Sequence, residues 1–101
     1  MTLGQAQRKF TLMIAKLIIF AYEQGYELTF GEGYDDDGIG HAKGSLHYIK
    51  LAQDLNLFKD DVWLKESEAH DELHDYWDTI GGAKRIEGDG NHYSVEWRGK
   101  R

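Results

Sequence analysis

The stretch SLHYIKLAQDLNLF, residues 45–58, decides the fold that this sequence predicts. Its apolar residues fall on alternate positions, at Ile49, Leu51, Leu55 and Leu57. A period of two is typical of an extended strand, because successive side chains of a strand point to opposite faces. We therefore predict a strand within Ile49–Phe58. The residues before it, Asp35–Gly44, hold three consecutive Asp and three Gly and are predicted to form a loop.

Helices are predicted on both sides of this strand. Apolar residues recur at three- and four-residue steps through Gln5–Gln24, which gives one wide apolar face, and Gly25 is well placed to end the helix. A second helix is predicted from Ser67, as the N-cap, to about Ile80. Acidic residues in its first turn favour this start, and Gly81–Gly82 is expected to end it.

Three further strands and their connections complete the predicted fold. Residues Tyr26–Tyr34 and Val62–Leu64 are expected to be strands, and His92–Trp97 is the last. A turn is expected at Asp60–Asp61 and a loop at Glu87–Asn91. These elements predict an α+β fold, in which an N-terminal helix and a second helix pack on a small, mainly antiparallel sheet.

Composition narrows the class of protein. A chain of 101 residues predicts a single domain, residues 1–101, with a modest core. The absence of Cys excludes disulfides, a Cys-based zinc site and a thiol nucleophile. A net charge of -6 argues against nucleic acid as a partner. The apolar stretch Phe10–Tyr22 contains Lys16 and is shorter than the ~20 residues of a membrane-spanning helix, so no membrane insertion is expected.

Two histidine pairings compete as candidate metal ligands. His70 and His74 lie in HDELH, which is similar to the zinc-binding HExxH helix, but Asp71 stands where that motif has its catalytic Glu. The surrounding charged run favours a solvated helix face instead. The other candidates, His47 and Asp54, are seven residues apart. That is about 10 Å along a helix, and in a strand the two would point to opposite faces.

A common zinc site for His47 and Asp54 therefore requires a loop carrying the histidine to turn into a strand carrying the aspartate. On spacing alone, the two are more often ordinary surface residues. SLHYIKLAQD, residues 45–54, however, resembles the S-x-H-x-x-G-x-A-x-D signature of the D-alanyl-D-alanine carboxypeptidase (VanY-like) metallopeptidases. DGNHY, residues 89–93, is similar to that family's downstream pattern of an acidic residue, two positions, His and an aromatic. The sequence also resembles small bacteriophage members of this family from residue 28 onwards. The matching blocks, in order, are LTFGEGY, SLHYIKLAQDLNLF, WDTIGG and GDGNHYSVEWRGKR.

The resemblance implies a zinc site on the sheet of a hedgehog/DD-peptidase-like fold. Its protein ligands would be His47, Asp54 and His92, with water in the fourth position. Asp89 matches the family's general base, which would take a proton from that water as it attacks a peptide carbonyl. Glu87 is the fallback for this role.

The resemblance also implies a substrate. Peptidoglycan stem or cross-link peptides would be hydrolysed, with an endolysin-type L-alanyl-D-glutamate endopeptidase favoured over a D,D- or L,D-carboxypeptidase. Ser45, Tyr34 and Tyr93 are expected to contact the substrate. A monomer made in the host cytoplasm without a signal peptide, and released to the cell wall, fits such a phage product.

The sequence departs from the family pattern at two places. Lys50 stands where the signature has Gly, and Asp35 stands where related phage sequences have Arg. Lys43 is a candidate to replace that positive charge. The alternative function is therefore a catalytically weakened wall-binding or virion-associated module that keeps the fold.

Overall fold

The computed structural model describes residues 1–35 and 44–101. Most of the predicted loop Asp35–Gly44, including Lys43, lies outside the described residues. The first helix, α1 (Leu3–Glu23), begins with a capping box in which Thr2 Oγ1 accepts from the Gln5 N–H and the Gln5 side chain accepts from the Thr2 N–H. It ends at Glu23, two residues before Gly25, whose φ of 88° is the left-handed conformation that glycine tolerates. The predicted helix is confirmed.

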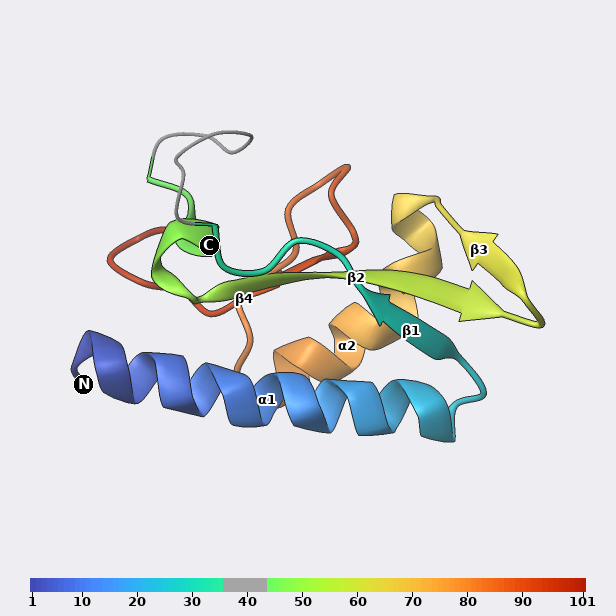
Figure 1. The fold of residues 1–101 in the computed structure, drawn as a ribbon, viewed down its shortest axis with the longest axis horizontal. Helices are drawn as coiled ribbons and strands as arrows, with labels where there is room; N and C mark the ends of the chain where they lie inside the picture. The colour runs from blue at the N-terminus through green and yellow to red at the C-terminus, as the bar shows by residue number, and fades with distance from the viewer. Residues whose placement is uncertain (36–43) are drawn as a thin grey trace.

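The sheet is built around β2 (Ala52–Lys59), which starts within the predicted region Ile49–Phe58, ends one residue beyond it and crosses the molecule lengthwise above α1 (Figure 1). The last part of β2 pairs antiparallel with β1 (Glu27–Phe30) and with β3 (Val62–Leu64). Its first three residues pair antiparallel with β4 (His92–Ser94). The antiparallel sheet is thus confirmed, although β1 and β4 are shorter than the predicted strands.

A two-residue turn joins β2 to β3, as predicted. Asp60 and Asp61 have φ values of 52° and 63°. Two consecutive positive φ angles define the tight hairpin turn whose twist matches that of the flanking strands. Both residues are exposed at the end of the molecule where β2 finishes.

The second helix starts differently from the prediction. Residues Ser67–His70 form a 3₁₀ turn, η2, which runs directly into α2 (Asp71–Thr79). Neither element has a side-chain hydrogen bond at its N-cap, so Ser67 as an N-cap is wrong. Its hydroxyl oxygen lies 3.4 Å from the Arg85 guanidinium instead. The predicted end near Gly81–Gly82 is confirmed.

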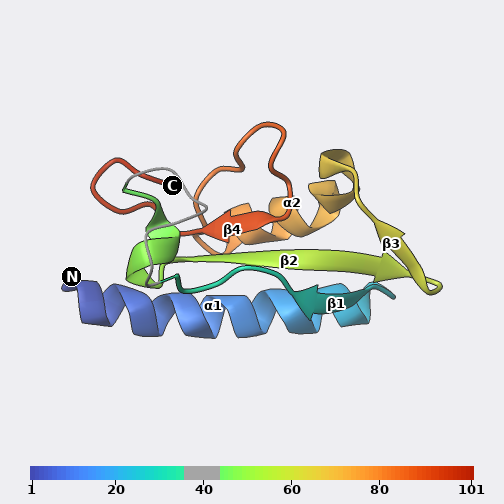
Figure 2. The same cartoon turned by 45° about the horizontal axis from the view of Figure 1, so that its top comes forward.

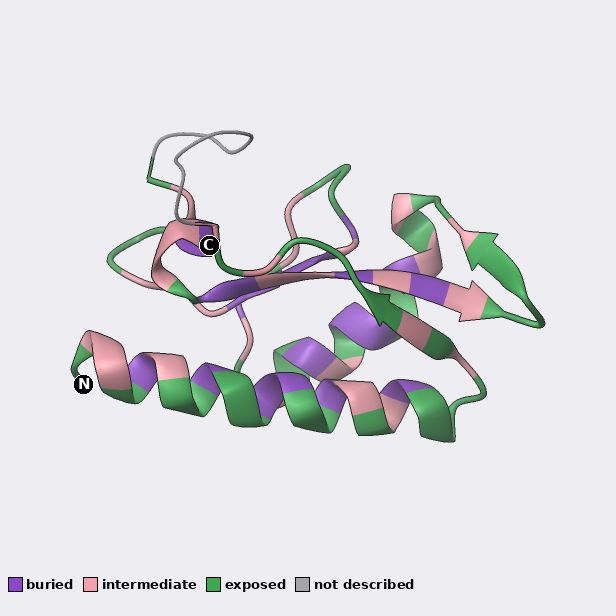
Figure 3. Cartoon of the chain, in the orientation of Figure 1, coloured by how far each residue is buried: buried purple, intermediate pink, exposed green. Residues whose placement is uncertain are grey.

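The core lies between the two helices and the sheet (Figure 3). Alternate residues of β2 enter it, as the period of two predicts. The helix α1, which runs alongside β2 (Figure 2), contributes one long buried face. Its fully buried side chains include Leu17, Leu51, Leu55, Leu57, Leu73, Trp77 and Tyr93. Each Å² of apolar surface removed from water contributes about 25 cal/mol to the free energy of folding, so this buried layer is the main source of stability. Within residues 1–35 and 44–101, no helix has the length and apolar character needed to cross a membrane.

Candidate metal centre

His47 lies on a short 3₁₀ helix, η1 (Leu46–Ile49), directly before β2. Ser45 caps it, because its hydroxyl accepts from the His47 N–H at 3.2 Å. Lys50 ends it with a φ of 60°, in the left-handed region. Residues other than glycine adopt this conformation infrequently. The turn into a strand that the seven-residue spacing required is present, in the form of η1.

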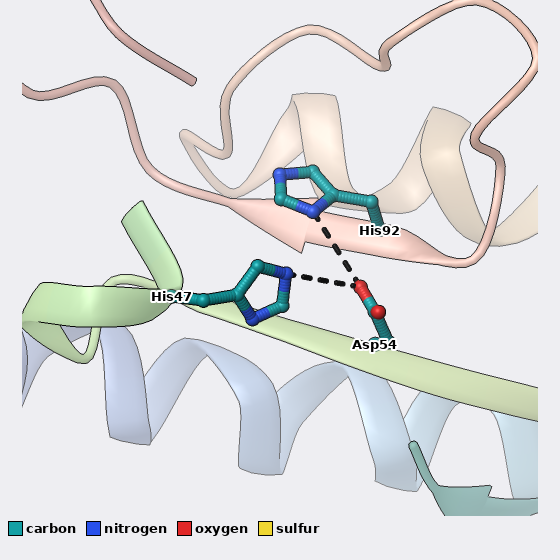
Figure 4. Close-up of side chains that lie close together, drawn as sticks. All are labelled: His47, Asp54 and His92. Atoms are coloured by element: carbon teal, nitrogen blue, oxygen red, sulfur yellow. Dashed lines mark ion pairs between the residues drawn. The ribbon is translucent and has the colours of Figure 1, made fainter. Parts of the chain in front are cut away.

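Asp54 and His92 are brought together by strand pairing. They are direct partners in the antiparallel register of β2 and β4. Directly opposite residues of such a pair have Cβ atoms about 4.5–5.5 Å apart on the same face of the sheet. Figure 4 shows the two side chains and that of His47 pointing toward one another. Three separate parts of the chain thus meet at one place.

The distances between the donor atoms suit a metal ion. Asp54 Oδ1 lies 3.3 Å from His47 Nε2 and 3.5 Å from His92 Nδ1, and the three atoms all lie within 4.8 Å of one another. Ligand atoms about 2.0–2.1 Å from zinc at the tetrahedral angle lie about 3.4 Å apart. The side chains are 2%, 18% and 8% exposed for His47, Asp54 and His92. This buried group could hold a metal ion.

The backbone fixes which nitrogen of His47 faces the centre. His47 Nδ1 lies 2.9 Å from the carbonyl oxygen of Gly33, so in the neutral ring Nδ1 carries the proton and donates it to that carbonyl. Nε2 then presents a lone pair to the Asp54 carboxylate. Two acceptors that face each other need a cation between them. Asp54 Oδ1 has no hydrogen-bond partner among the described residues, which leaves it available to such a cation.

Asp54 also attracts His47 and His92 when the shared cation is a proton rather than a metal ion. Burial works to raise the pKa of Asp54, but its close contacts with the His47 and His92 rings lower it to about 2. Burial works to lower the pKa of His47, yet contact with Asp54 and the Gly33 carbonyl raises it. The separations of 3.3 and 3.5 Å exceed the ~2.7–2.9 Å of a good charge-assisted hydrogen bond. The geometry therefore suits a metal better than a shared proton.

A cavity of about 310 Å³ opens onto the three side chains. Its wall also includes Ser45, Ile86, Asp89 and Arg101. Asp89, the predicted base, is exposed. Its backbone carbonyl accepts from the His92 N–H at 3.0 Å, which fixes the backbone of Asp89 relative to the start of β4. Glu87 lines a different cavity, which makes it the weaker of the two candidate bases. Arg101 is a cation at this site that the sequence did not reveal.

The predicted substrate contacts fare differently. Ser45 lines the cavity. Tyr34 is 56% exposed and lies beneath the Lys50 ammonium, 4.8 Å from the ring centre, and it is not among the described residues that line the cavity. Tyr93 is fully buried, and its hydroxyl bonds to His70 at 2.7 Å. A substrate contact through Tyr93 is wrong for this structure, because the side chain points into the core.

The competing pair, His70 and His74, is buried rather than solvated, with 2% and 3% exposure. His70 bonds to Tyr93, and His74 Nε2 lies 2.7 Å from the Gly90 carbonyl oxygen. In the part of the chain that the structure describes, the only set of three clustered ligands is His47, Asp54 and His92. The prediction that His70 and His74 lie on a solvated helix face is therefore wrong. Neither histidine belongs to the cluster of His47, Asp54 and His92.

Acid should destabilise the protein through His70. Burial lowers its pKa to about 4, and nearby His74 and Arg85 add to the effect. The unfolded chain binds this proton near pH 6.5, so stability falls as the pH drops from about 6.5 to about 4, by up to about 3 kcal/mol. His70→Asn, which does not titrate, should lose correspondingly less stability between pH 7 and pH 4.5 in urea unfolding. Equal acid sensitivity of both proteins would contradict this assignment.

Comparisons with known proteins give no match for this chain. No family model matches the chain. No curated protein and no solved structure matches it either.

Proposed function

We propose that this protein is a zinc-dependent peptidase that hydrolyses an amide bond in the stem or cross-link peptides of peptidoglycan. The observation that carries the proposal is the His47 lone pair, which the Gly33 carbonyl directs at the Asp54 carboxylate. Such an arrangement needs a cation, and two imidazoles with one carboxylate form a donor set typical of catalytic zinc. The motif residues supply the substrate class, through their resemblance to the VanY-like metallopeptidases.

The chemistry divides between the metal and the protein. Bound zinc would polarise the scissile carbonyl and lower the pKa of a coordinated water. Asp89, on the wall of the same cavity, would take a proton from the attacking water and pass it to the leaving amine as the C–N bond breaks. Ser45 holds the turn that carries His47. An L-alanyl-D-glutamate endopeptidase is the activity we favour.

The decisive experiment incubates purified protein with purified peptidoglycan and identifies the products by mass spectrometry. We expect new ends at one amide position, loss of cleavage with EDTA, and recovery when zinc is added back. Fragments that begin with D-glutamate identify the endopeptidase, whereas release of a single C-terminal residue identifies a carboxypeptidase. One bound zinc with no turnover on any wall substrate would instead identify the alternative, a wall-binding module.

One observation favours that alternative. Asp35, which replaces a family Arg, donates its backbone N–H to the His47 carbonyl at 3.2 Å. Asp35 therefore places an acidic residue next to His47. A cation at this position would help to bind an anionic substrate or to stabilise an oxyanion, and a carboxylate does neither. Turnover would then depend on another cation in the cavity wall. Arg101 lines this cavity and is the candidate.

Arg101→Met should therefore raise KM for a carboxylate-bearing peptide by about tenfold or more, with a smaller change in kcat. The magnitude follows from the loss of one charge-assisted hydrogen bond, worth about 1.5–3 kcal/mol, at about 1.4 kcal/mol per factor of ten. Arg98→Met is the matched control, because Arg98 is exposed and packs on Trp97. If both variants keep the wild-type KM in steady-state assays, Arg101 does not contact the substrate.

A further inference from the structure

His70, His74 and Trp77 form one buried stripe along η2 and α2. They are four and three residues apart, which is the spacing of side chains on a single helix face. Their exposures are 2%, 3% and 0%. All three have ring nitrogens, so each buried side chain brings a polar atom that needs a partner. The proposed chemistry of the metal centre uses none of them.

One ring nitrogen of each side chain bonds to a single short segment, residues 90–94, whereas His74 Nδ1 has no partner among the described residues. His74 Nε2 lies 2.7 Å from the Gly90 carbonyl oxygen, and Trp77 Nε1 donates to the Ser94 carbonyl at 2.8 Å. His70 Nδ1 is 2.7 Å from the Tyr93 hydroxyl. The His74 ring also stacks on that of Tyr93, with centres 4.3 Å apart. These contacts fall on both sides of the ligand His92.

The opposite edge of the same segment is held by β2. The Asn91 carbonyl accepts from the Leu55 N–H at 2.9 Å, and His92 is the register partner of Asp54. Gly90 fits closely against η2, because a Cβ there would lie 2.3 Å from the Ser67 carbonyl oxygen. The loop that carries Asp89 and His92 is therefore fixed between β2 on one side and η2–α2 on the other.

We propose that His74 is a positioning residue for the metal centre. Its ring N–H holds the Gly90 carbonyl, one residue after Asp89 and two before His92, and so sets where both side chains stand in the cavity. The proposal rests on the metal binding of the proposed function and not on the peptidase activity. Hydrogen-bonded residues behind a metal ligand typically change metal affinity by about 10–100-fold when they are replaced.

The test separates the hydrogen bond from the packing of the ring. His74→Phe keeps an aromatic ring against Tyr93 but has no N–H for the Gly90 carbonyl. His74→Gln loses the ring but places an amide N–H near the position of Nε2. Ile14→Val, in the buried face of α1, is the control for a mild core change on another element that leaves the hydrogen bonds of residues 90–94 in place.

Zinc dissociation constants, measured by competition with a chromophoric chelator, should rise by about 10–100-fold in His74→Phe. His74→Gln should recover most of that loss, and Ile14→Val should keep the wild-type value. In the zinc-free protein, amide hydrogen exchange at His92, whose N–H bonds to the Asp89 carbonyl, should be faster in His74→Phe than in the other two variants.

Two results would overturn the proposal. Zinc affinity and exchange in His74→Phe that match those of Ile14→Val would make His74 a packing residue only. A Gln variant as impaired as the Phe variant would show that the ring, and not its N–H, matters. If wild-type protein binds no zinc, the proposed function fails separately, while the exchange rates still report whether His74 holds the loop.

Discussion

Replacing His47 with alanine is expected to weaken zinc binding by about a hundredfold. Apparent binding free energies of about 10–16 kcal/mol for four-ligand zinc sites correspond to roughly 3 kcal/mol per ligand, and about 1.4 kcal/mol is a factor of ten. At zinc concentrations a hundred times the wild-type dissociation constant, the wild-type protein gains about 2.7 kcal/mol of stability. That gain raises its melting temperature by roughly 10–20 °C.

At the same zinc concentration, the His47→Ala variant is only about half saturated. Its gain is then about 0.4 kcal/mol, or roughly 2–3 °C. Calorimetry with and without zinc measures both shifts. Tyr48→Ala is the matched control, because it removes a ring from the same 3₁₀ turn but no ligand. A His47→Ala protein with the full wild-type shift would place the zinc elsewhere.

Asp89→Asn should lower kcat by about 10²–10⁴-fold, the usual contribution of a general base. The asparagine keeps the size of the side chain and the backbone bond from the His92 N–H to the carbonyl of residue 89. Zinc affinity should therefore stay close to the wild-type value. Single-turnover hydrolysis of a purified stem peptide, with zinc content measured on the same samples, tests both halves of this expectation.

The control is Glu87→Gln, which removes a carboxylate from the neighbouring cavity and leaves the metal-facing one unchanged. It should retain wild-type turnover. An active Asp89→Asn together with an inactive Glu87→Gln would transfer the role of base to Glu87. Loss of zinc from Asp89→Asn would mean that this residue holds the metal or its ligands rather than a proton.

Local patterns in the sequence predicted most of the fold. The alternation through Leu51, Leu55 and Leu57 correctly placed the buried face of β2, and the helical period together with Gly25 gave α1. The start of α2 was harder, since Ser67 looks like a cap but its hydroxyl faces Arg85. A tertiary contact with a distant arginine is not visible in local sequence.

The candidate site was only partly accessible from sequence. The register that sets Asp54 opposite His92 joins strands far apart in the chain, which no spacing rule encodes. The burial of Tyr93 could have been anticipated, because adjacent residues of a strand face opposite sides and His92 faces the cavity. The stripe of His70, His74 and Trp77 also has helical spacing, but the charged residues around it obscured the pattern.

The hairpin turn at Asp60 and Asp61 is a suitable attachment site for a label. It follows the last residue of β2, whereas Asp54 stands near the beginning of that strand, and both turn residues are exposed. The sequence has no cysteine, so a cysteine introduced at Asp60 would be its single thiol. A dye or a solid support coupled there would leave the cavity-bearing end of the molecule open to a polymeric substrate.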